Sequence, residues 1–120
     1  MNLSLATVMV WVARLCGLAA LGTGALSWFA YNAPLLVHVV LGGLLVSALF
    51  ILALRSPTSI TQRTALAVAV AVVVPLLGLL ELKPLLGQFQ WSLQWLHPAV
   101  GIGGIAMAEM FAKQIRSYRQ

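Results

Sequence analysis

The segment 35–54 reads LLVHVVLGGLLVSALFILAL and decides the fold class of this chain. It contains no acidic residue, lysine or arginine, and its length matches the roughly 20 apolar residues that an α-helix needs to cross a bilayer core of about 30 Å. Backbone polar groups find no water in lipid, and a helix pairs them within one segment. The segment therefore predicts a transmembrane helix that carries one histidine, His38, near its start.

Three further segments have the same character. They run from about Leu5 to Trp28, from Ala65 to Leu82 and from about Trp91 to Ala112. The whole chain is 62% hydrophobic and 8% charged, with a mean hydropathy of +1.01. We expect an all-α membrane protein, with four transmembrane helices in one up-down bundle over residues 1–120. Its two hairpins would span about 5–54 and 65–113.

The formal net charge of +5 is unevenly placed. Basic residues gather between the second and third apolar segments and at the C-terminus: Arg55, Arg63, Lys113, Arg116 and Arg119. The positive-inside rule places these regions and both termini in the cytoplasm, as expected for a multi-pass protein of a bacterial inner membrane. The charge then reflects topology and contact with the anionic lipid bilayer, so we expect no nucleic-acid partner.

The chain has only two histidines, His38 and His97, and each lies in an apolar segment. An ionisable side chain within a membrane helix is costly, which makes each a candidate functional residue. Both are expected at similar depth in the outer half of the bundle, roughly 6 and 9 Å below the helix ends at 1.5 Å per residue. We expect the second and fourth helices to be diagonal partners, with space between the imidazoles for one shared ligand.

Glycines accompany both histidines. Gly42 and Gly101 follow them by four residues, on the same helical face. Together with three more they form the candidate cofactor-binding set: Gly24, Gly42, Gly78, Gly101 and Gly104. Small residues also let membrane helices pack closely without any ligand, and for the glycines alone this packing interpretation stays open.

The ligand set favours haem over other metal groups. Zinc sites use three or four protein ligands, and no Cys, Asp or Glu is expected near these histidines. Copper could use methionine, but Met107 and Met110 fall toward the other end of the fourth segment. Haem needs two axial ligands, and histidine serves that role. The alternative is that the two histidines only form hydrogen bonds across helices.

With these residues the chain resembles small bacterial b-type cytochromes of the cytochrome b561-like kind, which are four-helix membrane bundles with histidine-ligated haem and glycines near the ring. The resemblance implies one haem b with His38 and His97 as axial ligands, and electron transfer with quinone or a periplasmic redox partner. It would make the chain an oxidoreductase or an electron-transfer subunit. Such proteins commonly carry two haems on four histidines, whereas this chain can ligate one.

A single haem in the outer half cannot carry electrons across the membrane by itself, so the resemblance also implies a partner, as a homodimer or a larger membrane redox complex. The haem propionates would face the nearer, outer surface. Lys83 is the cationic candidate there, and uncharged candidates are Tyr31, Asn32, Gln88, Gln90 and Trp91.

Three other functions remain open at this point. The chain could be a small transporter, although its first helix carries Arg14 rather than an acidic residue. It could be a structural or assembly subunit, or a protein that handles or senses haem without redox turnover.

We also expect Arg14 to pair with Glu109 in a buried contact between the first and fourth helices, because charges within a membrane usually pair.

Overall fold

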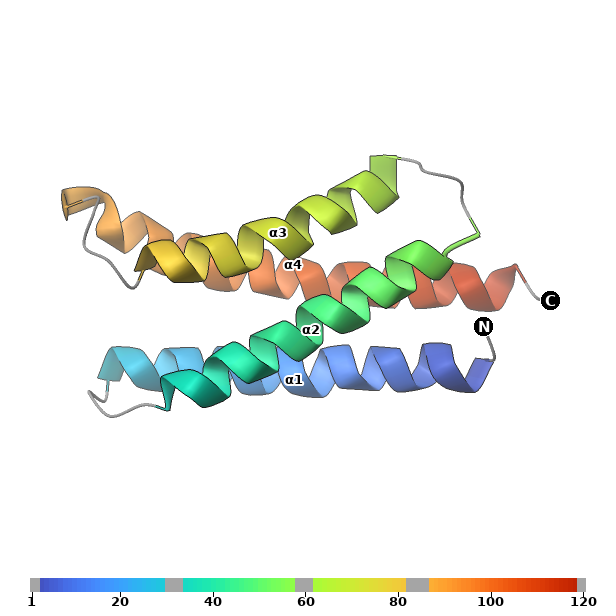
Figure 1. Cartoon of the computed structure of the whole chain (residues 1–120), viewed down its shortest axis with the longest axis horizontal. Coiled ribbons are helices and arrows are strands. Elements are labelled where there is room, and N and C mark those ends of the chain that lie inside the picture. Colours follow the sequence, from blue (N-terminus) through green and yellow to red (C-terminus); the bar gives the residue numbers. More distant parts are fainter. Residues whose placement is uncertain (1–2, 30–33, 58–61, 82–86, 119–120) are drawn as a thin grey trace.

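The structure is a computed structural model, and it describes residues 3–29, 34–57, 62–81 and 87–118. These residues form four long helices and one short 3-10 turn (Figure 1). The helices are α1 (Leu3–Phe29), α2 (Leu35–Arg55), α3 (Gln62–Glu81) and α4 (Gln90–Ser117), and the turn η1 (Gly87–Phe89) precedes α4. The all-α fold expected from the sequence is confirmed.

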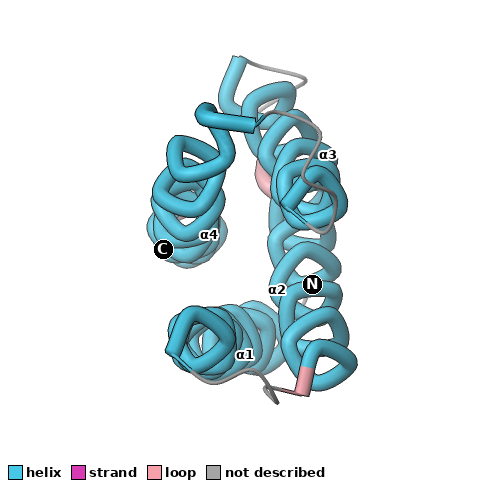
Figure 2. The backbone as a smooth tube through the Cα atoms, turned by 90° about the vertical axis from the view of Figure 1, so that its left-hand side faces the viewer, coloured by secondary structure: helices cyan, strands magenta, loops and turns pink. Residues whose placement is uncertain are grey.

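The helices run alternately up and down along the long axis of a molecule that measures 50 × 25 × 16 Å (Figure 1). Both chain termini lie at one end of the bundle, which we call the inner end, and the opposite end is the outer end. Figure 2 shows α2 and α3 along one side, with α1 and α4 along the other.

Two of the described helices, α1 over Leu5–Phe29 and α2 over Leu35–Arg55, are long and apolar enough to cross a membrane, and α3 contains a shorter apolar stretch, Ala65–Glu81.

The second and fourth helices are diagonal partners, as expected from the sequence. Within the described residues α2 contacts all three other helices, including α4, while α1 and α3 do not contact each other. The diagonal between α2 and α4 is therefore the short one, and these two helices touch directly across the bundle. Small residues at their contact explain the short distance, since a Cβ atom added at Gly104 would lie only 3.9 Å from Leu49 of α2.

Packing is tightest in the inner half of the bundle. The buried core contains Phe111 and Leu49, which are 0% and 1% exposed, and small side chains from all four helices. Its members are Ala6, Val10, Ala13, Leu45, Ala48, Leu49, Leu52, Ala53, Ala67, Ala108, Phe111, Ala112 and Ile115. The small alanine side chains let the helix backbones approach closely, which increases the dispersion contacts between helices.

Pro98 lies inside α4, because the structure begins this helix at Gln90, and His97 is the eighth residue of the helix. Proline has no N–H group for the ladder, and the helix continues on both sides of it. At the start of α2, Pro34 occupies the position just before the helix, and its carbonyl accepts the backbone N–H of His38 at 3.1 Å.

The expected pair of Arg14 and Glu109 forms between α1 and α4. The guanidinium also lies over the Trp11 ring, 4.9 Å from its centroid. The side chains are 40% and 36% exposed, so the pair lies at the edge of the helix contact rather than buried inside it. The expectation of a buried pair was wrong because the alanine-rich core fills the space between the helices.

We predict that Phe111→Ala destabilises the bundle much more than Phe50→Ala. Phe111 is fully buried, and truncating such a side chain leaves a cavity and costs roughly 3 kcal/mol. Phe50 is 41% exposed and serves as the matched control. Thermal unfolding of both purified variants in one detergent measures the difference. Equal losses for the two variants would contradict the assignment of the core.

Candidate histidine site

The structure brings the two histidines together at the outer half of the bundle. His38 is the fourth residue of α2 and His97 the eighth residue of α4. Their ring centroids are 5.9 Å apart, and the ring planes are tilted by 41°. Two residues 59 positions apart in the sequence thus form one local site.

His38 is held by the backbone of α1. Its Nδ1 lies 2.8 Å from the carbonyl oxygen of Ala20 and 3.3 Å from Oγ1 of Thr23. The Thr23 hydroxyl itself donates to the carbonyls of Ala19 and Ala20. Because a carbonyl only accepts hydrogen bonds, Nδ1 must carry the proton in the neutral imidazole. The other nitrogen, Nε2, then presents a lone pair, which is the form that binds a metal.

Glycines make room for both rings. A Cβ atom added at Gly24 of α1 would lie 3.1 Å from Cε1 of His38, and one added at Gly78 of α3 would lie 3.1 Å from Cε1 of His97. These distances are tighter than an ordinary van der Waals contact, so a larger residue would push the imidazole out of place. In each hairpin, a glycine of the first helix therefore receives the histidine of the second helix.

The two hairpins share a further feature. Gly24 follows Ala20, the acceptor for His38, by four residues, and Gly78 follows Val74 by four residues. Val74 thus takes the position on α3 that Ala20 takes on α1, but Nδ1 of His97 is buried without a hydrogen-bond partner among the described residues. Both histidines therefore lie against a glycine of the preceding helix. Only His38 also has a hydrogen bond at Nδ1.

The other glycines of the candidate set differ from Gly24 and Gly78. Cβ atoms added at Gly42 and Gly101 would meet no atom within 4 Å, although both residues are partly buried. Open space therefore lies one helical turn inward of each histidine. Gly104 lies deeper, against Val70 and Leu49, and its contacts are with the packed helices rather than with either imidazole.

The polar residues proposed at the outer surface are only partly described. Lys83, Tyr31 and Asn32 lie outside the described residues. Gln90 donates a hydrogen bond from Nε2 to the carbonyl of Glu81 and so joins the start of α4 to the end of α3. Trp28 and Trp95 meet edge to face with centroids 5.4 Å apart, which joins α1 to α4 at the same end.

Sequence reasoning missed the groups that orient His38. A main-chain carbonyl such as that of Ala20 leaves no mark in a sequence. Thr23 did leave a signal, because it is a polar residue next to Gly24 within an apolar helix. The Thr23 hydroxyl donates to carbonyls of the preceding helical turn, a common arrangement for threonine within a helix. Its oxygen also lies 3.3 Å from Nδ1 of His38.

The two imidazoles are the candidate metal ligands expected from the sequence, and they lie next to each other. Within residues 3–29, 34–57, 62–81 and 87–118, no group of three or more His, Cys, Asp or Glu side chains is placed to hold a metal ion. A metal bound by two imidazoles from opposite sides, about 2 Å from each nitrogen, holds the ring centroids roughly 6 Å apart. The observed separation of 5.9 Å fits that arrangement.

Comparisons of the chain with protein-family models, with curated proteins and with solved structures found no match.

We predict that neutral His38 carries its proton on Nδ1. Imidazole ¹⁵N chemical shifts of the full chain, recorded in detergent above the titration range, separate the two tautomers. A His97→Gln variant assigns the signals, and its remaining histidine should show a protonated Nδ1 and an unprotonated Nε2. A proton on Nε2 would show that the hydrogen bond to Ala20 is not formed.

Proposed function

We propose that this chain is a four-span inner-membrane protein that holds one haem b between His38 and His97 and exchanges electrons with quinone or a periplasmic redox partner. The observation that carries the proposal is the pair of imidazoles 5.9 Å apart, one of them oriented by a backbone carbonyl. Bound haem would supply one-electron redox chemistry, and histidine ligation and the surroundings would tune its potential.

The residues around the histidines suit that group. Nε2 of His38 is left as a lone pair by the hydrogen bond at Nδ1, a partnership that fixes ring orientation and raises ligand basicity at metal sites. Gly24 and Gly78 provide the clearance for the two rings, and Gly42 and Gly101 leave space beside them. Leu45 and Leu49, which are 5% and 1% exposed, would bound the haem on its inner side with apolar atoms.

The proposed membrane placement follows the charges. Arg55 ends α2, and Lys113 and Arg116 lie near the end of α4, so the inner end of the bundle carries these basic side chains. The positive-inside rule assigns that end and both termini to the cytoplasm. The histidines then lie nearer the periplasmic surface, within reach of a periplasmic carrier or of quinone in the outer leaflet.

We predict a low-spin b-type spectrum in protein purified from haem-supplied cells. His38→Gln and His97→Gln should each abolish that spectrum, because each removes one axial ligand. Ser47→Ala is the control, since Ser47 is exposed and bonds only to the carbonyl of Gly43. Reduced-minus-oxidised difference spectra provide the measurement. Absence of a Soret band, or its survival in both histidine variants, would overturn the assignment.

Reduction by a soluble quinol separates electron transfer from haem handling. Electron transfer requires the bound haem to become reduced and then reoxidised by an added quinone. A haem that binds through both histidines but is never reduced by quinol would identify a handling or sensing protein instead.

We also predict that Gly42→Leu lowers haem content while Gly43→Leu does not. Gly42 lies one turn from His38 beside open space, whereas Gly43 is exposed on the outside of α2. Both variants carry the same added volume and the same helix propensity. Haem-to-protein ratios and thermal unfolding without haem are measured together. Equal haem content in the two variants would show that the space at Gly42 is not used by the cofactor.

A further inference from the structure

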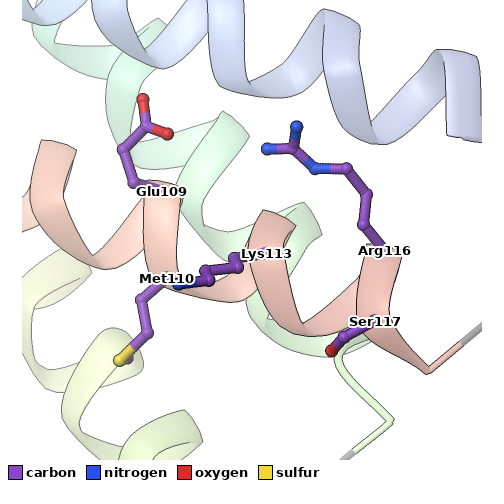
Figure 3. Close-up of a pocket in the computed structure, with 5 residues that line it drawn as sticks. All are labelled: Glu109, Met110, Lys113, Arg116 and Ser117. Atoms are coloured by element: carbon purple, nitrogen blue, oxygen red, sulfur yellow. The ribbon is translucent and has the colours of Figure 1, made fainter.

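A second candidate site lies at the inner end of the bundle, far from the histidines along the helices. A shallow hollow there is lined by residues of α4 alone: Glu109, Met110, Lys113, Arg116 and Ser117 (Figure 3). In Figure 3 the Arg116 side chain extends from the last turns of α4 toward α1, and Lys113 extends toward Met110.

The charges around this hollow are unequal. Glu109 is already engaged by Arg14 of α1, so its carboxylate is neutralised from outside the hollow. Lys113 and Arg116 are exposed, and among the described residues neither forms a salt bridge. Arg116 donates from Nε to the carbonyl of Ala112, which fixes the side chain and leaves its two terminal amino groups for another acceptor.

The shape and setting of the hollow suit a molecule with an anionic head and an apolar body. Arginine presents paired donors that match the oxygens of a phosphate, and lysine adds a point charge beside them. Met110 adds an apolar side chain to the lining of the hollow. Trp11 and Tyr118, which are 52% and 77% exposed, lie at the same end, and such aromatic side chains favour the membrane interface.

We propose that this hollow binds the phosphate of an acidic phospholipid from the cytoplasmic leaflet, through Lys113 and Arg116. The proposal rests on the proposed membrane placement but not on haem. A lipid is favoured over free phosphate because the hollow opens at the depth where headgroups lie and has an apolar wall for the glycerol and upper acyl chain.

The test uses the full chain in a neutral detergent, with phosphatidylglycerol and phosphatidylcholine titrated separately and retained lipids counted by native mass spectrometry. The wild type should retain one phosphatidylglycerol in preference to phosphatidylcholine, and raised salt should weaken that retention. The double variant Lys113→Gln/Arg116→Gln should bind phosphatidylglycerol about tenfold more weakly or worse. Arg55→Gln, which removes a basic residue at the end of α2, should keep the preference.

Three results would overturn the proposal. They are equal retention of the two lipids by the wild type, an equal loss in Arg55→Gln, and displacement of the lipid by inorganic phosphate. Thermal unfolding and the haem spectrum of the same samples provide independent readouts. Loss of lipid preference with an unchanged haem spectrum separates this site from the histidine site, and a missing haem spectrum with intact lipid preference does the converse.

Discussion

The site at the outer half of the bundle depends on one hydrogen bond, from Nδ1 of His38 to the carbonyl of Ala20. An imidazole placed among apolar helices must find an acceptor for its N–H, because a buried polar group without a partner costs free energy. The backbone of α1 supplies that acceptor, and Gly24 one turn later provides the clearance for the ring. The bond determines which nitrogen carries the proton, and therefore which nitrogen is available to a ligand.

The second hairpin, formed by α3 and α4, has the same contact between a glycine and a histidine but lacks the hydrogen bond at Nδ1. On α3 Val74 precedes Gly78 by four residues, as Ala20 precedes Gly24 on α1, and His97 lies against its glycine as His38 does. Nδ1 of His97 nevertheless lacks a well-formed hydrogen bond. The two hairpins are therefore alike in the contact between glycine and histidine, and they differ in the hydrogen bond at Nδ1.

Much of the fold could be predicted from the sequence, because apolar length and charge placement depend on local composition. The approximate helix bounds and the pairing of Arg14 with Glu109 were predicted in this way. The contacts of Gly24 and Gly78 with the two histidines were not, because they depend on how the helices of each hairpin meet. The direct contact of α2 with α4 could not be predicted, since it depends on how small residues of separate helices meet. The hydrogen bond from His38 to the Ala20 carbonyl could not be predicted either, because every residue has a main-chain carbonyl and the sequence does not mark this one. Gly104 looked equivalent to Gly101 in the sequence, yet it contacts Leu49 and Val70.

The uneven packing of the bundle has a consequence for the order of assembly. The core cluster occupies the inner half, from Ala6 and Val10 on α1 to Phe111 and Ile115 on α4. Cβ atoms added at Gly42 and Gly101, nearer the outer end, would meet no described atom within 4 Å. The four helices can therefore associate through their inner halves without any contribution from the space near the histidines. Under the proposed function, joining the helices and filling that space would be separate steps.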